Sequence, residues 1–218
     1  MSTSPREPSV GRTARKRRAI LDAATSLFLR NGFRATSMDE VASLAGVSKQ
    51  TVYKQFTDKE HLFREIIAGV TPEADAIAAI LTTAFGEAPA ASRDELEARL
   101  RRMARVYLDG VLRPEVLALR RLLISEAEQF PDLALDYYAQ APARGIDVVA
   151  RLLAPHVDSG LLVADDLQLA AAHFAYLALG PAQDRALFIP AEPPSDEERD
   201  RLAAAAARAF VAAYGAAG

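Results

Sequence analysis

The sequence predicts an all-α fold of about nine helices, with a small N-terminal head before a larger helical body. Half of the 218 residues are hydrophobic, mostly Ala and Leu, which is enough apolar side chain for a substantial core. Apolar residues recur every three or four positions, and no alternating strand pattern or internal repeat stands out. The predicted divisions are a disordered arm over 1–11, the head over 12–57 and the body over 58–218.

The head begins with a predicted helix over about 13–31. One of its faces is apolar, and Asn31-Gly32 is typical of a helix end. The apolar residues of that face are Ile20, Ala24, Leu27 and Phe28.

Residues 37–56 are predicted to form two short helices joined by a tight turn. Ser37 can cap the first helix, and Glu40 three residues later completes a capping box. Gly46 supplies the backbone freedom that the turn requires. Ser48 caps the second helix, which buries an apolar pair at i and i+4, Val52 and Phe56. A helix–turn–helix places such a second helix in the DNA major groove.

The outer face of this second helix suits contact with phosphates and base edges. Its five residues can all hydrogen-bond and none is acidic: Lys49, Gln50, Thr51, Tyr53 and Lys54. Two short amphipathic helices with a glycine turn also occur in many helical proteins, so this pattern alone leaves a purely structural interpretation open.

Charge is distributed unevenly along the chain. Residues 1–57 contain 10 Lys/Arg and 4 Asp/Glu, a formal charge of +6, whereas residues 58–218 contain 16 and 25, a charge of −9. A basic head on an acidic body indicates nucleic-acid contact at one end, although uneven solvated charge has the same count. The basic run 12–18 would follow DNA phosphates or enter a minor groove, or would serve as a solubilising tail.

The body is predicted to continue with helices over 58–85, 92–111, 114–129, 132–154, 165–179 and 195–214. A kink is expected at Thr71-Pro72, and Pro142 is expected either to kink its helix or to split it. Residues 155–160 are predicted to be a loop, Gly180-Pro181 to end a helix, and 189–195 to be a proline-rich connection.

The head residues keep one order and spacing without a gap: Ile20-Leu21-Asp22-Ala23-Ala24, Leu27-Phe28, Asn31-Gly32-Phe33, Thr36-Ser37-Met38, Val41-Ala42, Ala45-Gly46-Val47-Ser48, Val52-Tyr53, Phe56 and Lys59-Glu60-His61-Leu62-Phe63. Residues 15–67 therefore resemble the TetR/AcrR family of transcriptional regulators. The resemblance implies DNA contacts at Lys49, Thr51, Tyr53 and Lys59, with Thr36 and Ser37 near phosphates. The full predicted DNA-binding set adds Arg17, Ser48, Gln50 and Lys54.

Residues 119–153 resemble the regulatory domain of the AefR-like branch of that family. The matching residues are Ile124, Glu126-Ala127-Glu128, Phe130-Pro131, Leu133, Tyr138 and Pro142-Ala143-Arg144. This resemblance implies nothing about the identity of a ligand.

Two alanine-rich segments, 167–179 and 202–214, favour a homodimer. Alanine lets helix backbones approach closely, and pairing both segments with their symmetry mates would make an isologous four-helix interface. An ordinary intramolecular core is the alternative. The predicted interface residues are Leu169, Ala172, Tyr176, Ala206, Phe210 and Tyr214.

The middle helices are then predicted to enclose a pocket for an unknown small apolar effector. Its candidate walls, each of which could instead be plain core, are Phe85, Met103, Tyr107, Leu123, Tyr137, Tyr138, His173 and Phe174.

Other chemistry has little support in the sequence. There is no cysteine, and the three histidines, His61, His156 and His173, lack metal-ligand spacing. No catalytic residue, metal site or cofactor is predicted, and no apolar run reaches the ~20 residues of a membrane span.

Together these observations predict a cytoplasmic, homodimeric transcriptional regulator, more a repressor than an activator. It would bind a palindromic double-stranded operator and be released by the effector. The alternatives are an effector-free architectural DNA-binding protein, or a helical hydrophobic-ligand carrier or enzyme with a vestigial head.

Overall fold

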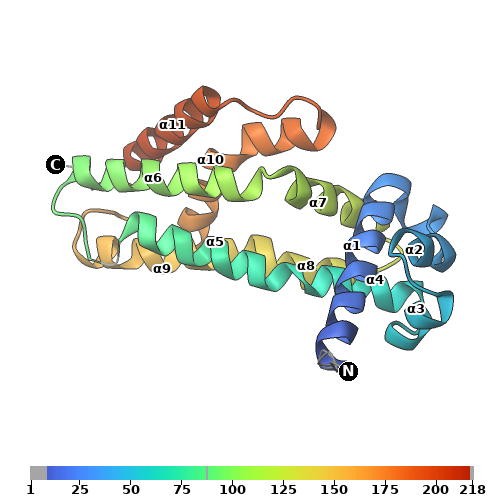
Figure 1. Ribbon diagram of the computed structural model, residues 1–218. Helices are drawn as coiled ribbons and strands as arrows, with labels where there is room; N and C mark the ends of the chain where they lie inside the picture. Colours follow the sequence, from blue (N-terminus) through green and yellow to red (C-terminus); the bar gives the residue numbers. More distant parts are fainter. Residues whose placement is uncertain (1–8, 87, 217–218) are drawn as a thin grey trace, which may run out of the picture. The chain divides into compact units, whose positions relative to one another are not determined.

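The computed structural model describes residues 9–86 and 88–216, so most of the predicted arm over 1–11 lies outside the described residues. The helices are α1 (Ser9–Ala35), α2 (Met38–Leu44), α3 (Lys49–Gln55), α4 (Lys59–Ala68), α5 (Val70–Phe85), α6 (Arg93–Val111), α7 (Pro114–Glu126), α8 (Pro131–Tyr138), the π turn η1 (Ala139–Ala143), α9 (Arg144–Asp158), α10 (Leu167–Phe188) and α11 (Asp196–Tyr214) (Figure 1). Within the described ranges, counting α4–α5 as one bent helix and α8–η1–α9 as another gives nine, which confirms the all-α prediction.

Several predicted boundaries differ from the structure. Helix α1 begins at Ser9, so residues 9–11 of the predicted disordered arm are helical. Helix α9 continues through Pro155, and α10 continues through Pro181 to Phe188. A proline removes one N–H from a helix, and at the exposed Pro181 water can satisfy the carbonyl that this leaves free. Pro142 does interrupt its helix, as predicted, by forming the π turn.

The chain folds as two compact units, and their limits differ from the predicted division at residues 57 and 58. The first unit comprises Met1–Gly69 and Leu122–Leu133, and the second comprises Val70–Arg121 and Ala134–Gly218. Helix α4 and the segment 122–133 join the first unit because their aromatic residues complete its core. Phe130 packs on Phe33 and Phe63, with ring centroids 4.9 and 5.6 Å apart, and Phe63 in turn packs on Phe28 at 5.5 Å.

The second unit is built around α6, which packs against α5, α10 and α11 (Figure 1). Leucine, alanine and phenylalanine side chains from these helices and from α9 form one continuous buried core. His156 lies within it, and its Nε2 accepts a 3.0 Å hydrogen bond from the Ala90 N–H. Burial lowers the pKa of His156, so the imidazole is neutral near pH 7.

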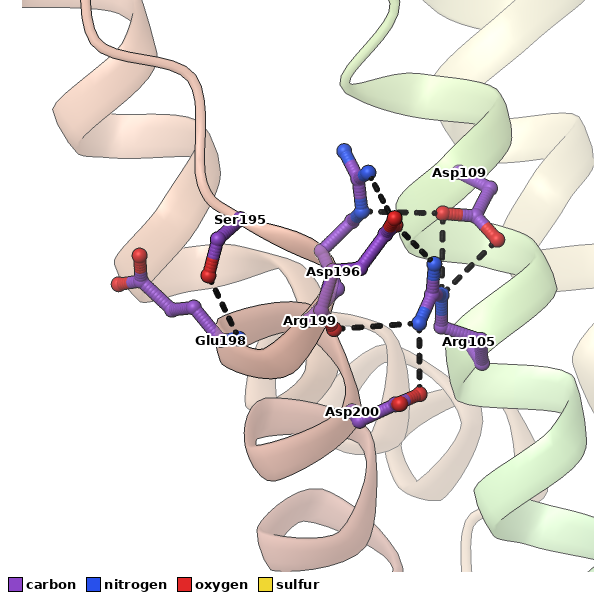
Figure 2. Close-up of polar contacts among 7 residues, drawn as sticks. All are labelled: Arg105, Asp109, Ser195, Asp196, Glu198, Arg199 and Asp200. Carbon is purple, nitrogen blue, oxygen red and sulfur yellow. Dashed lines mark hydrogen bonds and ion pairs between the residues drawn. The ribbon is translucent and has the colours of Figure 1, made fainter.

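A cluster of charged residues fixes the start of α11 on α6 (Figure 2). Arg105 of α6 contacts the carboxylates of Asp109, Asp196 and Asp200 at 2.9, 2.7 and 2.6 Å. Arg199 contacts Asp196 at 2.6 Å, and hydrogen bonds from both guanidinium groups lower the pKa of that carboxyl. A shared network of this kind holds two helices in one register more effectively than an isolated surface pair.

By length and composition alone, the stretch Lys59–Phe85 is apolar enough to cross a membrane. A single such stretch is weak evidence, because core helices of water-soluble proteins pass the same test. Two acids within it, Glu73 and Asp75, are paired with Arg113 and Arg144, and Leu81 and Phe85 are buried in the core of the second unit.

Candidate nucleic-acid interface and pocket

The helix–turn–helix is held in place by the short-range contacts expected from the sequence. The Ser37 N–H donates to the Glu40 carboxylate at 2.8 Å, and the Glu40 N–H donates to Ser37 Oγ at 3.2 Å. These two bonds form the capping box, and the hydrogen bond from the Ser37 backbone lowers the pKa of Glu40. The turn passes through Gly46 with φ of +65°, a conformation that favours glycine.

Helix α3 is capped and anchored as predicted. Ser48 Oγ accepts from the Thr51 N–H at 3.2 Å and also hydrogen-bonds Thr51 Oγ1 at 2.8 Å. Val52 and Phe56 are fully buried, which fixes the rotation of α3 about its own axis. The opposite face of α3 therefore points to solvent.

The exposed face of α3 carries the side chains predicted to contact DNA. The side chains of Gln50 and Lys54 make no hydrogen bond or ion pair with any residue in 9–86 or 88–216, and Tyr53 is 46% exposed. Lys49 is exposed but pairs with Asp39 of α2 at 2.8 Å, and its hydrogen bond to this carboxylate raises the pKa of Lys49. A phosphate would have to compete with Asp39 for Lys49, whereas the side chains of Gln50 and Lys54 can contact DNA without first breaking an interaction within the protein.

Three residues of the predicted DNA-binding set instead hold the first unit together. Thr36 is 2% exposed and its hydroxyl donates to the Gly32 carbonyl at 2.9 Å, so its side chain cannot reach a phosphate in this conformation. Lys59 donates to the carbonyls of Phe33, Arg34 and Thr36 at 2.8, 3.1 and 2.9 Å. An ammonium group has three donors, and all three are used here.

Arg17 also makes contacts within the protein. Its guanidinium pairs with Glu65 at 2.8 Å and lies over the Phe56 ring at 4.9 Å. These contacts join α1 to α4 and to the end of α3. The sequence could not indicate them, because each partner is at least 39 positions away. In this DNA-free structure the side chains of Arg17, Thr36 and Lys59 thus contact other parts of the first unit, and their DNA contacts stay a prediction.

The second unit contains a pocket of about 90 Å³ lined by α5, α6, α7, α10 and the segment from Tyr137 to Ile146. Of the eight predicted wall residues, Tyr107 and Tyr137 line it. Phe85, Met103 and Phe174 are core residues at most 1% exposed, Leu123 belongs to the first unit, and Tyr138 is 51% exposed. His173 is also exposed, and its Nδ1 hydrogen-bonds the Tyr214 hydroxyl.

The pocket prediction was wrong for these six residues because helical spacing identifies a buried face without showing whether that face meets a cavity or another helix. It also missed Arg120, a charged residue at i+3 from the buried Leu117. A charged residue on the buried face of a helix is the sequence signal that could have identified Arg120.

The predicted dimer residues divide in a similar way. Leu169 and Tyr176 of α10 are 51% and 58% exposed, and Ala172 is half-buried. Ala206 and Phe210 of α11 are buried inside the unit, and Tyr214 is half-buried beside Phe210. Phe210 packs on Phe174 of α10 with centroids 5.3 Å apart. Ala206 and Phe210 are therefore core residues of the chain and are removed from the predicted interface.

Comparison with known proteins identifies the family. Residues 20–66 match the family described as "Bacterial regulatory proteins, tetR family", and residues 98–216, more than half of the chain, match "AefR-like transcriptional repressor, C-terminal domain". The chain belongs to the TetR family of bacterial transcriptional regulators. This TetR-family protein is thus a DNA-binding regulator of transcription, and TetR-family regulators are not enzymes.

Solved structures of TetR-family proteins are similar along almost the whole chain. A putative TetR-family regulator from Mesorhizobium loti is 36% identical with a TM-score of 0.80, covering 94% of this chain and 98% of that one. The flavonoid-responsive regulator FrrA is 30% identical with a TM-score of 0.69, covering 93% and 98%. The regulator YhgD of Bacillus subtilis is 47% identical over 58 residues, which is 27% of this chain and 30% of YhgD. The chain thus matches this curated relative over less than a third of its length.

Among the described residues, no group of three or more His, Asp or Glu side chains is placed to hold a metal ion.

Proposed function

We propose that this TetR-family protein is a homodimeric, cytoplasmic repressor that binds a palindromic DNA operator through α3 and is released when a small, largely apolar molecule enters the pocket of the second unit. The observation that carries the DNA part is the exposed face of α3. It is fixed by the burial of Val52 and Phe56, and it presents Gln50 and Lys54 without partners among the described residues. Amide side chains read adenine edges and lysines pair with phosphates or guanine, so this face suits both tasks.

The pocket supports the effector part of the proposal. Most of its walls are aliphatic, and FrrA, with which the chain shares 30% identity, is named as flavonoid-responsive. The chain runs from α4 through Gly69 directly into α5, whose Val70, Ala74 and Ile77 line the pocket. A ligand that shifts α5 therefore acts on the helix that continues into the DNA-binding unit. Ligand and DNA then weaken each other's binding reciprocally, typically by about 1–3 kcal/mol.

The exposed apolar side chains of α10 support assembly into a dimer. Leu169, Tyr176 and Leu177 are all more than 40% exposed and lie at i, i+7 and i+8, on one side of the helix. Pairing this side with a second copy would remove it from water. A palindromic operator presents two half-sites in successive major grooves, about 34–36 Å apart, one for the α3 helix of each copy.

The test is to select DNA from random fragments with the purified full-length protein and to measure affinity against salt. A palindromic product bound as a dimer, with a steep fall of affinity in salt, supports the proposal. A selected product that no small molecule releases would favour the effector-free architectural alternative. Failure to select any DNA would contradict the operator proposal.

A further inference from the structure

The pocket of the second unit combines apolar walls with an unpaired cation. Aliphatic side chains make up much of the lining, among them Ile77, Leu81, Val111, Val116 and Leu179. Three charged residues also line it: Glu73, Arg120 and Arg144. Their states of pairing differ, and this difference indicates what the pocket binds.

Two of these three charges are neutralised within the protein. Glu73 pairs with Arg113 at 3.1 Å, and Arg144 pairs with Asp75. The side chain of Arg120, on α7, makes no hydrogen bond or ion pair with any residue in the described ranges, and its Nε is buried from solvent although the residue as a whole is partly exposed. Within the part of the chain that the structure describes, Arg120 is the pocket's only charge without a counter-ion.

A buried guanidinium N–H without a partner is unfavourable, because it has lost its hydrogen bond to water and gained none in return. A hydrophobic residue of similar size would fill the position without that cost. The position is therefore better explained by a bound anion than by the stability of the fold. The planar fork of arginine donors matches a carboxylate, which it can bind through two parallel hydrogen bonds.

A second donor lies in the same pocket. Tyr107 is buried, and its hydroxyl makes no hydrogen bond with another described residue. Burial raises the pKa of Tyr107 to about 12, although the nearby Arg120 charge acts in the opposite direction, so the hydroxyl keeps its proton near pH 7. Gly145 gives this hydroxyl its space, because a Cβ at that position would lie 2.5 Å from Tyr107 Oη.

We infer that the effector is an amphipathic organic acid. Its carboxylate pairs with Arg120 and accepts a hydrogen bond from the Tyr107 hydroxyl, and its apolar body lies along the aliphatic walls. This inference deepens the proposed function and rests on it, because the bound acid is an effector only if its binding controls DNA binding. It adds a single negative charge to the small, largely apolar molecule of the proposed function.

The experiment measures ligand binding to the full-length protein in the absence of DNA. The probes are three acids with their matched amides: benzoate and benzamide, 3-phenylpropanoate and 3-phenylpropanamide, and octanoate and octanamide. Calorimetric titrations at pH 7.5 compare each acid with its amide, which has nearly the same shape but no charge. We expect at least one acid to bind about tenfold or more tightly than its amide, as charge-assisted hydrogen bonds would give.

Three variants identify the source of any preference for the acid. Arg120→Met keeps the length of the side chain and should abolish the preference, while its melting temperature stays equal to or above that of the wild type. Arg120→Lys retains the positive charge but lacks the planar pair of guanidinium donors, so it should show a smaller preference for the acid over its amide. Arg101→Met removes a charge from an exposed position of α6 outside the pocket and should keep the full preference.

The inference is wrong if no acid binds more tightly than its amide, including the case in which neither binds. It is also wrong if Arg120→Met retains the preference. Failure of the proposed function would look different, since an acid preference without any selected DNA would leave the pocket assignment intact. If only neutral molecules released the selected DNA, the proposed regulatory function would stand and the inference of an acidic effector would be wrong.

Discussion

Replacing Phe210 tests whether this side chain belongs to the core or to a dimer interface. The sequence places Phe210 at a predicted interface between two copies of the chain, whereas the structure buries it to 1% exposure within a single chain. Its ring meets Phe174 edge-on with centroids 5.3 Å apart and stacks on Tyr214 at 4.7 Å. Replacing it with alanine should therefore destabilise the subunit itself rather than only its assembly.

The expected magnitude follows from the burial of Phe210. Removing a fully buried phenylalanine costs about 3–5 kcal/mol, which combines the lost transfer free energy with the cavity left behind. The two ring contacts favour the upper part of this range, because aromatic pairs add about 0.5–1.5 kcal/mol to simple burial. A domain is typically stable by only about 5–15 kcal/mol, so Phe210→Ala should lose a large fraction of the total.

The assay is urea unfolding followed by far-UV circular dichroism at several protein concentrations. Tyr176→Ala is the matched control, because Tyr176 is 58% exposed on α10. Phe210→Ala should lower the unfolding midpoint at every concentration, whereas Tyr176→Ala should act mainly through a change in concentration dependence. Sedimentation of both variants would show which one dissociates. If Phe210→Ala kept the wild-type midpoint and produced folded monomers, the assignment of Phe210 to the core would be refuted.

Three further predictions concern the first unit. Gln50→Ala should cost about 1–3 kcal/mol of operator affinity and relax specificity, whereas Lys54→Ala should weaken all sequences alike and lower the salt slope by about one, as measured by fluorescence anisotropy. Ser37→Ala removes the N-cap of α2 and should cost about 1 kcal/mol in urea unfolding. The hydrogen bond from Arg17 lowers the pKa of Glu65 below its usual 4.5, so this pair stabilises the folded protein above about pH 4.5 and the contribution is lost as pH falls through the lowered pKa. The stability difference between wild type and Arg17→Met should therefore be constant near pH 7 and shrink on acidification.

Each of these predictions has an outcome that contradicts it. Unchanged operator affinity in both the Gln50 and Lys54 variants would exclude the exposed face of α3 as the DNA-reading surface. Ser43→Ala, at an exposed position in the last turn of α2, is the control for the Ser37 cap, and an equal loss in both variants would rule out a capping effect. A difference between wild type and Arg17→Met that stayed constant down to pH 3 would show that the pair contributes through packing rather than charge.

Much of the candidate DNA interface could be predicted from the sequence because local contacts fix it. The cap at Ser37 reaches three residues to Glu40, the cap at Ser48 reaches three residues to Thr51, and the turn depends on one glycine. Interactions of this range depend on neighbouring residues alone. The exposed face of α3 then follows from the spacing of Val52 and Phe56.

The pocket and the orientation of the last two helices could not be predicted in this way. Helices α10 and α11 carry alanine on nearly every side, so the periodicity of apolar residues does not show which face of each helix packs against the core. The structure turns Phe210 inward and leaves Leu169 and Tyr176 exposed, and this choice depends on how α10 and α11 pack with α6.

The sequence by itself therefore determined the all-α class, the helix–turn–helix and the family resemblance of this protein, because these depend on spacing within a few turns of helix. Only the tertiary structure decided that Lys59 and Arg17 make contacts within the first unit, with partners that the sequence places at least 23 residues away. It also decided that Arg120 lines a pocket without a counter-ion. A side chain's neighbours across the fold are set by the packing of whole helices, and spacing along one helix contains no information about them.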